Sequence, residues 1–359
     1  MGIKVLYVIS TLGGGGAENQ LFYFCSNLSK KESVSFDVCA IRDGGVLEKR
    51  FINIGVKPLI LNARSFLKAV IKLRKTIKRG GYDIVHAHMF FSDIVCRLAT
   101  LGLKVKIVCT HHGLGMWKKN WLVLFDKMTK NRVDHFIVVS ERSYEIRKTR
   151  EKYPPAKMSV IYNGVPDYFF MDSKKQLPKD VIVFGCVARF TKNKQMNYLV
   201  EVLNKLKKTY NLRLELVGEG EEFSSVQKLV SDYNLENNVV FHGWSDKIRD
   251  IISSWDYFML CSINEDLPVS LLEAMAVGLV PIATNVGGIP KLLNYGELGV
   301  LCDSNDFQSY CDGLTSLIES HKYSIISEKC IEYVRKNFSI ENNVEKCLAL
   351  YSSILQRGE

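Results

Sequence analysis

Apolar runs typical of buried strands alternate with amphipathic helical segments along almost the whole chain. In the first half the predicted strands are 3–9, 35–41, 57–61, 83–87, 106–110, 134–139 and 158–162, and the predicted helices are 17–29, 66–79, 91–101, 118–130 and 141–150. Continuous apolar strands are typical of parallel sheets covered on both faces. The strict alternation therefore predicts an α/β fold.

A polar, proline-containing segment from 163 to 179 interrupts this alternation, and a second series follows it. Its predicted strands are 181–187, 212–217, 238–242, 256–261, 280–283 and 298–302, and its predicted helices are 195–209, 222–233, 247–253, 268–277, 307–320, 324–336 and 341–356. A chain of 359 residues exceeds one ordinary core. We predict two α/β domains with a ligand cleft between them, beyond the carboxyl ends of the strands. The boundaries are 1–165, a linker at 166–180, 181–338, and a helix at 339–359 that packs back towards the first domain.

Composition excludes several classes of protein. No apolar run reaches the ~18–20 residues of a membrane span, and the N-terminus reads as a strand rather than a signal peptide. The ten cysteines form no Cys-x-x-Cys pattern, so we expect a reducing, cytoplasmic setting without disulfides or zinc.

The net charge of +10 is compatible with nucleic acid, an anionic membrane or an acidic substrate. It is concentrated in two basic amphipathic helices, at 66–79 and 117–130. The first carries Lys68, Lys72, Arg74, Lys75, Lys78 and Arg79; the second carries Lys118, Lys119 and Lys127 among Trp117, Trp121, Leu122, Leu124, Phe125 and Met128. These helices suit a membrane surface, and solvated or core-packed helices of an α/β domain are the alternative.

Two glutamates, Glu265 and Glu273, flank a mostly apolar run after the predicted strand 256–261. Pro268 stands where a helix would begin, at a position where its missing N–H costs nothing. The first carboxylate then lies at a strand-to-helix turn, and the second lies roughly 7–8 Å further along the helix. The helix start between them offers N–H groups to a phosphate. This spacing favours a nucleotide sugar, with its central diphosphate and hydroxyl-bearing rings; two glutamates on an exposed helix edge are the alternative.

Arg189 and Lys194 lie on the loop after the first strand of the second series. Two cations at the carboxyl edge of a parallel sheet could neutralise the charge on a departing diphosphate. An ordinary basic loop is the alternative.

Four glycines, 13–16, follow the first strand and precede a helix. They allow the backbone to approach an anion closely, in front of a helix N-terminus. The run matches neither a dinucleotide fingerprint nor a Walker A motif, and an unliganded flexible turn is the alternative.

Histidines end two strands of the first series. His111 and His112 end one of them, so one of the two faces the cleft and could bond a sugar hydroxyl or the acceptor. His86 and His88 are similar strand-end residues with weaker claims. A metal site is not expected, because no carboxylate stands at ligand spacing. Structural histidines are the alternative.

Together these segments resemble the GT-B-fold retaining glycosyltransferases of family 4, a large group that builds bacterial polysaccharides. The resemblance covers essentially the whole chain. It rests on segments 15–18, 83–88, 112–113, 161–165, 189–194, 216–220, 265–278 and 284–288.

The resemblance implies the GT-B plan of two Rossmann-like domains facing each other across a cleft, with the nucleotide sugar bound by the second and the acceptor by the first. By resemblance Arg189 and Lys194 hold the diphosphate, Glu265 contacts the transferred sugar, Glu273 bonds the ribose, and His112 lies near the reacting sugar. The implied donor site also includes Gly14, Gly15, Gly16, Asp266, Leu267, Pro268 and Val269. The family implies no metal and no other cofactor, because protein cations and helix dipoles do that work.

The resemblance further implies sugar transfer with retention, from a UDP-sugar rather than a GDP-sugar, to a glycan acceptor linked to a polyprenyl diphosphate. The expected setting is bacterial surface polysaccharide synthesis, such as O-antigen or capsule, by a cytoplasmic enzyme peripheral at the anionic inner face of the cytoplasmic membrane.

The chain departs from the family pattern at three places. Asp266 replaces the glycine that usually follows the first glutamate. Val280-Pro281 reverses the usual order, in which proline precedes the aliphatic residue. Lys291 stands where an acidic residue often follows Gly-Gly-x-Pro. None of these departures removes an implied catalytic group, but Asp266 leaves the identity of the transferred sugar open.

Two other classes compete with this prediction. Nucleotide-sugar 2-epimerases share the two-domain plan, but the Arg189–Lys194 loop and the carboxylate spacing favour transfer. A non-catalytic assembly protein or a nucleic-acid-binding protein is the non-enzymatic alternative; we find no binding motif for nucleic acid.

Overall fold

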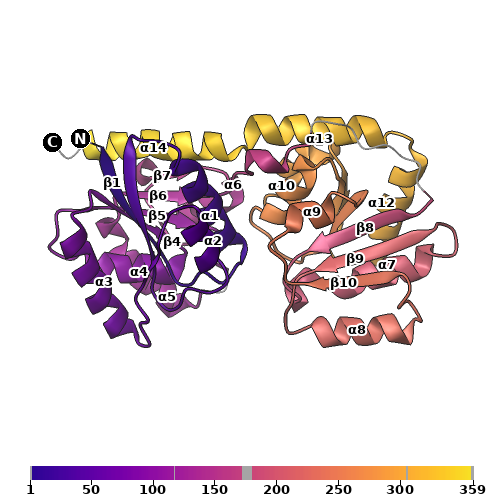
Figure 1. The fold of residues 1–359 in the computed structure, drawn as a ribbon, viewed down its shortest axis with the longest axis horizontal. Helices are drawn as coiled ribbons and strands as arrows, with labels where there is room; N and C mark the ends of the chain where they lie inside the picture. The colour runs from indigo at the N-terminus through magenta and orange to yellow at the C-terminus, as the bar shows by residue number, and fades with distance from the viewer. Residues whose placement is uncertain (1, 117, 172–179, 305, 357–359) are drawn as a thin grey trace. The chain divides into compact units, whose positions relative to one another are not determined.

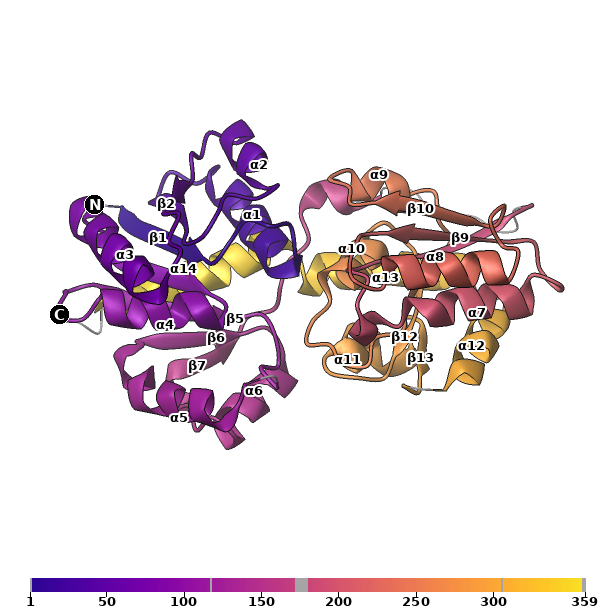
Figure 2. The same ribbon diagram turned by 90° about the horizontal axis from the view of Figure 1, so that it is seen from below.

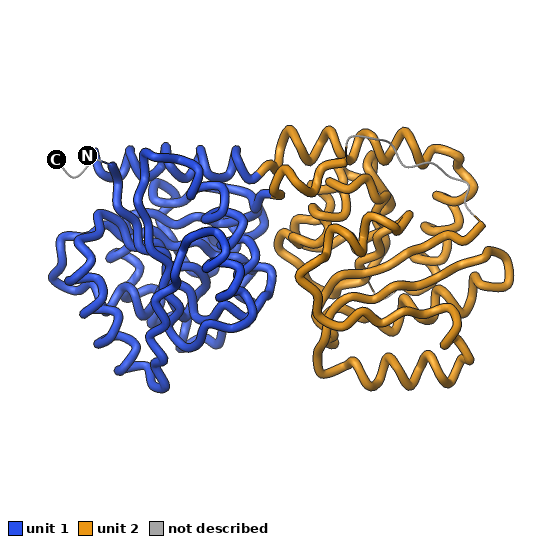
Figure 3. The backbone as a smooth tube through the Cα atoms, in the orientation of Figure 1, with its two compact units in different colours: residues 1–164, 340–359 blue, residues 165–339 orange. Residues whose placement is uncertain are grey.

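The chain forms two compact units in the computed structural model, which describes residues 2–116, 118–171, 180–304 and 306–356. Unit 1 consists of residues 1–164 and 340–359, and unit 2 of residues 165–339 (Figure 3). Each unit contains its own parallel sheet with helices on both faces. The predicted α/β class with two Rossmann-like domains is therefore confirmed.

Among its described residues, unit 1 contains a seven-stranded parallel sheet in the order β3-β2-β1-β4-β5-β6-β7 (Figure 1). The strands are β1 (Ile3–Ile9), β2 (Val34–Ala40), β3 (Leu59–Ile60), β4 (Ile84–His88), β5 (Lys106–His111), β6 (His135–Val138) and β7 (Met158–Val160). The helices are α1 (Gly16–Leu28), α2 (Glu48–Asn53), α3 (Phe66–Gly80), α4 (Phe90–Ala99), α5 (Asn120–Thr129), α6 (Glu141–Thr149) and α14 (Ile340–Gln356).

The period of two along a strand decides which side chains meet which helices in unit 1. On β1, Leu6 and Val8 point into a core built with α3 and α4. Tyr7, between them, points to the opposite face, where α1 and α14 pack together and the Tyr351 hydroxyl reaches that of Tyr7 at 3.3 Å (Figure 2). Strand-end residues therefore divide between two different environments.

Unit 2 contains, among its described residues, a six-stranded parallel sheet in the order β10-β9-β8-β11-β12-β13. The strands are β8 (Ile182–Val187), β9 (Leu212–Val217), β10 (Val239–Gly243), β11 (Tyr257–Leu260), β12 (Val280–Thr284) and β13 (Val300–Cys302). The helices are α7 (Met196–Leu206), α8 (Phe223–Asp232), α9 (Ile248–Ile252), α10 (Val269–Ala276), α11 (Ile289–Leu292), α12 (Phe307–Glu319) and α13 (Tyr323–Asn337). The strand order reverses between β8 and β11, and open α/β sheets bind ligands at such a switch point.

Apart from shifts of one to three residues at the ends of elements, the predicted elements and the observed ones differ in three places. α2 and α11 are not in the prediction, because six and four residues are too few to show a helical period. The helix expected at 118–130 begins at Asn120. Within the segment expected to be a linker, residues 166–171 belong to unit 2, where Phe169 and Phe170 are buried; residues 172–179 lie outside the described part of the chain.

Every helix in the described part of the chain is too short or too polar to cross a lipid bilayer.

Candidate active site

Glu265 and Lys194, both predicted site residues, form an ion pair in unit 2 between Oε1 of the glutamate and Nζ of the lysine. Ser262 donates its hydroxyl to the same carboxylate oxygen at 2.7 Å. The side chains of Lys194 and Glu265 are only 20% and 12% exposed. Within the described part of the chain the other oxygen, Oε2, has no hydrogen-bond partner, so it is the oxygen that can accept from a ligand hydroxyl.

A glycine turn holds the backbone of Glu265 and Asp266 in place. The N–H of Gly288 donates to the carbonyl of Asp266 at 2.8 Å. Gly287 has a φ of +59°, and a Cβ there would lie 1.7 Å from the carbonyl oxygen of Glu265. Only glycine fits this position, which explains Gly287, the first glycine of the Gly-Gly pair on which part of the family resemblance rests.

The loop that carries Arg189 is anchored by its neighbour Phe190, which is fully buried and packs on Phe223 with ring centroids 5.1 Å apart. Gly218 lies against the same loop, and a Cβ there would lie 2.0 Å from the carbonyl oxygen of Ala188. Arg189 itself is exposed, and it makes no ion pair with the described residues. A cation without a protein partner beside a buried anchor is available to an anion.

The helix α10 starts one residue later than predicted, at Val269, with Pro268 as its N-cap residue in extended geometry (φ −69°, ψ 114°). Glu273 lies one and a half turns into the helix and is 5% exposed. Leu267 and Asp266 are buried as well. The alternative of two glutamates on an exposed helix edge is therefore wrong.

The four-glycine segment of unit 1 forms the N-terminus of α1. Gly15 is the N-cap residue, and Gly16 is the first residue of the helix. The side-chain amide of Asn19 donates to the carbonyl of Gly14 at 2.9 Å, which closes the turn over the first residues of the helix. Gly14 has a φ of +84°, which explains a glycine at that position.

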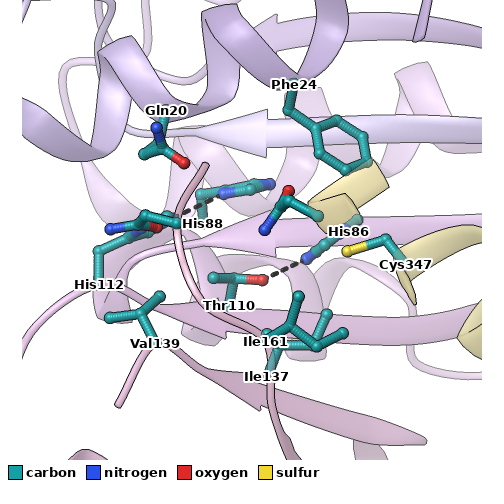
Figure 4. A pocket seen from close by; sticks show the side chains of 12 residues that line it. Gln20, Phe24, His86, His88, Thr110, His112, Ile137, Val139, Ile161 and Cys347 are labelled. Atoms are coloured by element: carbon teal, nitrogen blue, oxygen red, sulfur yellow. Dashed lines mark hydrogen bonds between the residues drawn. The ribbon is translucent and has the colours of Figure 1, made fainter. Parts of the chain in front are cut away.

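The two consecutive histidines at the end of β5, His111 as its last residue and His112 directly after it, face opposite sides of the sheet. His111 is buried near Asp93 on the α4 side, with 3.8 Å between the imidazole Nε2 and the carboxylate. His112 lines a small pocket of unit 1 on the opposite side, together with His88 and Asn163 (Figure 4). His112 is thus the histidine that a ligand of this pocket would meet.

His88 and His112 are hydrogen-bonded to each other, with 2.9 Å between Nδ1 of His88 and Nε2 of His112. Burial lowers the pKa of His112 to about 4, and the neighbouring Asn163 side chain opposes this shift. Burial also lowers the pKa of His88 well below its ordinary range. Both rings are neutral at physiological pH.

His86 has a structural role at the floor of the same pocket. Its Nδ1 lies 2.5 Å from the hydroxyl of Tyr351. Its Nε2 lies 2.7 Å from the hydroxyl of Thr110 (Figure 4). Burial lowers its pKa to about 3. Both ring nitrogens are engaged, so His86 fixes α14 to the sheet.

A buried ionic network holds the loop that follows His112. Lys118 pairs with Asp126 and Glu151, both at 3.1 Å. Arg147 pairs with Glu151 and donates to the carbonyl of Gly113 at 2.8 Å. Arg97 joins Asp126 to Asp93. The prediction of Lys118 as a surface lysine of a basic helix is wrong, because its chain position precedes α5 and its charge is paired inside unit 1.

Two residues close to the predicted site were missed as site residues. Ser262 stands three residues before Glu265, directly after a buried strand, and a hydroxyl at that position was a usable signal. His88 was a weaker candidate than His111 and His112, because a sequence cannot show that the His88 ring meets His112 on the neighbouring strand.

Comparisons with known proteins agree with this geometry. The sequence profile of the Glycosyltransferase Family 4 matches residues 14–167, and that of Glycosyl transferases group 1 matches residues 168–337. The chain is 27% identical over 298 residues to the N-acetyl-alpha-D-glucosaminyl L-malate synthase of Bacillus anthracis, covering 79% of this chain and 78% of that protein.

It is also 28% identical over 309 residues to the UDP-Gal:alpha-D-GlcNAc-diphosphoundecaprenol alpha-1,3-galactosyltransferase of Escherichia coli, covering 79% of each. The fold is similar to that of Anabaena HepE, solved with UDP and glucose, with a TM-score of 0.86 at 19% identity over 98% of this chain and all of that one. A glycosyltransferase from Rickettsia africae matches at a TM-score of 0.84 and 22% identity over 99% of each chain. The chain therefore belongs to the GT-B glycosyltransferases of family 4.

Proposed function

We propose that this glycosyltransferase moves a sugar, with retention, from a UDP-sugar to a lipid-linked glycan during the assembly of a bacterial surface polysaccharide. The observation that carries the proposal is the Lys194–Glu265 ion pair at the carboxyl edge of the unit 2 sheet, with the exposed Arg189 on the same loop as Lys194. A carboxylate for a sugar hydroxyl and cations for a diphosphate then stand next to each other.

Each of these residues has a distinct task in the proposed reaction. Arg189 and Lys194 neutralise the diphosphate as its charge grows in the transition state. Glu265 keeps Oε1 on Lys194 and Ser262 and offers Oε2 to a hydroxyl of the transferred sugar. Two protein cations at the diphosphate supply the charge that a metal would otherwise supply, so we propose metal-independent transfer.

Retention would follow from attack on the same face from which the diphosphate leaves. The acceptor oxygen forms a bond to the anomeric carbon, the carbon–oxygen bond to the diphosphate breaks, and the acceptor proton passes to a phosphate oxygen. No side chain needs to form a covalent intermediate. The anomeric configuration of the product, measured by NMR against the donor, tests this step; an inverted product would exclude it.

The choice of UDP and of a lipid-linked acceptor rests on relatives. The name of the Escherichia coli relative contains both a UDP-sugar and a diphosphoundecaprenol acceptor. The Anabaena structure was solved with UDP. A panel of nucleotide diphosphates in a thermal-shift assay tests the base, because a ligand stabilises the folded state by its affinity for it.

The central test removes the cations one at a time. Arg189→Ala and Lys194→Ala should each lose roughly 2–4 kcal/mol of transition-state stabilisation, mainly as kcat. Lys192→Ala, an exposed lysine on the same loop, is the matched control and should keep wild-type turnover. Wild-type kcat in both site variants would refute the proposal.

We also propose that unit 1 binds the anionic inner face of the cytoplasmic membrane. On α5, Trp121, Leu124 and Met128 recur at helical spacing and are 65%, 60% and 75% exposed. On α3, Phe66, Leu67 and Ile71 are exposed beside Lys68, Lys75 and Lys78. Exposed apolar side chains flanked by lysines suit a lipid surface, where each basic residue contributes about 1 kcal/mol.

Not every lysine of the two predicted basic helices is available to bind an anionic membrane surface. Lys72 donates to the carbonyl of Leu61 at 2.6 Å, and Lys118 is paired in the interior. Replacing Lys68, Lys75 and Lys78 with Gln should therefore weaken co-sedimentation with anionic vesicles at low salt. The control replaces Lys208, Lys228 and Lys329, exposed lysines of unit 2. Equal loss in both variants would point to net charge rather than to this surface.

A further inference from the structure

Asn193 joins the loop after β8, which carries Lys194, to the loop after β11, which carries Glu265. Its side-chain Nδ2 donates to the carbonyl of Asn264 at 3.0 Å. Its own carbonyl accepts the N–H of Ile263 at 2.8 Å. Asn193 directly precedes Lys194, and Asn264 directly precedes Glu265. These two hydrogen bonds, which we call the Asn193 clasp, therefore connect the backbone right beside both members of the ion pair.

Strand pairing does not hold these two loops together. β8 and β11 are neighbours in the sheet, but the register between them ends at Gly185 and Phe258, before either loop begins. Within the loop after β8, the N–H of Lys194 donates to the carbonyl of Thr191 at 2.9 Å and closes a 3-10 turn. Lys194 therefore moves with Asn193 if the clasp opens. Beyond the end of the register, the clasp joins the backbones of the two loops.

We propose that Asn193 is a positioning residue, which holds Lys194 and Glu265 at a fixed separation before any donor binds. The ion pair cannot do this alone, because a lysine reaches its partner through a flexible aliphatic stem, whereas the carbonyl that binds Asn193 belongs to the backbone. A site that is held in place in advance needs less reordering when the transition state forms. Asn193 thereby presents a cation and a carboxylate together to the diphosphate and the sugar of a nucleotide sugar. That reading of the ligand rests on the proposed function; the clasp does not.

Asn193→Ala removes the donor on Nδ2 and keeps the backbone bond to Ile263. We expect kcat to fall roughly three- to tenfold, the scale of one hydrogen bond between neutral groups. The matched control is Asn211→Ala, which removes a side-chain amide bonded to the carbonyl of Asp180 at 2.8 Å, before the amino end of β9. The two variants lose the same kind of bond in unit 2, so their urea midpoints should be similar, but only Asn193→Ala should lose turnover. In a Lys194→Ala background, Asn193→Ala should lower kcat by a smaller factor than in the wild type, because the ion pair that the clasp positions is already gone.

A measurement without substrate tests the clasp itself. In the full-length protein, we expect the amide hydrogen of Ile263 to exchange roughly tenfold faster in Asn193→Ala than in the wild type, and at the wild-type rate in Asn211→Ala. Faster exchange together with a loss of turnover confined to Asn193→Ala supports the proposal. Unchanged exchange at Ile263, an equal loss of turnover in both variants, or kcat effects of Asn193→Ala and Lys194→Ala that simply multiply would overturn it. Because exchange needs no substrate, a wild type that transfers no sugar would count against the proposed function alone.

Discussion

The orientation of the Glu265 carboxylate depends on Ser262, an uncharged residue that the charge pattern of the sequence does not indicate. Ser262 is fully buried at the end of a strand and donates to the carboxylate oxygen that also binds Lys194. Two donors on Oε1 restrict the rotation of the side chain and direct Oε2 away from the protein. The hydroxyl therefore positions the carboxylate without contacting a substrate.

We predict that Ser262→Ala lowers kcat/KM roughly ten- to hundredfold, because a hydrogen bond to a charged group contributes about 1.5–3 kcal/mol. The fold should persist, since the change removes one oxygen atom. Steady-state kinetics on the purified variant checks this. Ser253→Ala, which removes a hydroxyl bonded to a helix carbonyl on α9, is the control and should leave kcat/KM unchanged. Equal kinetics for the two variants would contradict the positioning role.

At the scale of elements, the loop after β5 is held by charges rather than by apolar packing. Asp126, on α5, accepts from Arg97 at 2.7 Å and from Lys118 at 3.1 Å. Burial alone would raise the pKa of Asp126, but Arg97 and Lys118 outweigh it and lower the pKa. The network joins α4, α5 and α6 to the segment that follows His112.

We predict that Lys118→Met lowers the free energy of unfolding of unit 1 by about 3 kcal/mol, because Asp126 and Glu151, both buried, each lose one of their two cationic partners. The neighbouring Lys119→Met should change it by less than about 0.5 kcal/mol, since Lys119 is exposed. Urea unfolding of both variants measures the difference. Similar midpoints for the two would show that the network contributes nothing to stability.

The buried histidines make unit 1 sensitive to acid. Burial lowers the pKa of His86 to about 3 and that of His112 to about 4, and it also lowers those of His88 and His111. The folded state keeps these rings neutral, whereas in the unfolded chain they take up protons near pH 6.5. The contribution of these neutral histidines to the free energy of unfolding is therefore fully present above about pH 6.5, and it is lost as the pH falls below that value.

We predict that the free energy of unfolding of unit 1 falls between pH 6.5 and 5, by up to about 1.4 kcal/mol per pH unit for each of these histidines. Urea titrations at several pH values, followed by NMR signals of unit 1, measure the slope. His111→Phe should reduce it by the share of one histidine. A slope of zero in the wild type would mean that these rings take up protons in the folded state as readily as in the unfolded state.

The sequence predicted most of these elements and part of the site, for reasons that can be named. Long apolar strands and helices of ten or more residues show their period; α2 does not, because it has only six residues. The period of two placed His111 and His112 on opposite faces, but the helix that covers each face depends on tertiary packing. Lys194 and Glu265 are 71 positions apart, so their contact follows from the order of β8 and β11 in the sheet.

At the scale of the whole molecule, the chain passes from unit 1 to unit 2 after residue 164 and returns after residue 339. Where unit 2 begins and ends, the N–H of Val165 donates to the carbonyl of Phe338 at 2.8 Å. The returning segment is α14, which buries Val344, Cys347, Tyr351 and Ile354 in unit 1. Unit 1 is complete only with the last helix of the chain.

We predict that a chain ending at residue 339 loses the fold of unit 1 and keeps that of unit 2. Removing α14 exposes several side chains that contribute about 1.5–3 kcal/mol each, which together approach the whole stability of a domain. Hydrogen exchange on β1 and β4 compared with β8 and β11 reports the two units separately. Tyr351→Phe, which removes only the Tyr351 hydroxyl that bonds to His86, is a milder variant for comparison. Protection of β1 and β4 in the shortened chain would contradict the prediction.

Because the chain leaves unit 1 and returns to it only at α14, the ribosome synthesises the two parts of unit 1 at different times. The strands of the unit 1 sheet are all synthesised by residue 160, yet α14 begins only at residue 340. At a rate of synthesis of about 5–20 residues per second, the helix that covers Tyr7 and His86 is made on the order of 10–30 s after the last strand of this sheet. Unit 2 is synthesised as one continuous stretch in that interval. During that time the nascent chain exposes the part of this sheet face that α14 later covers, and a chaperone could bind there.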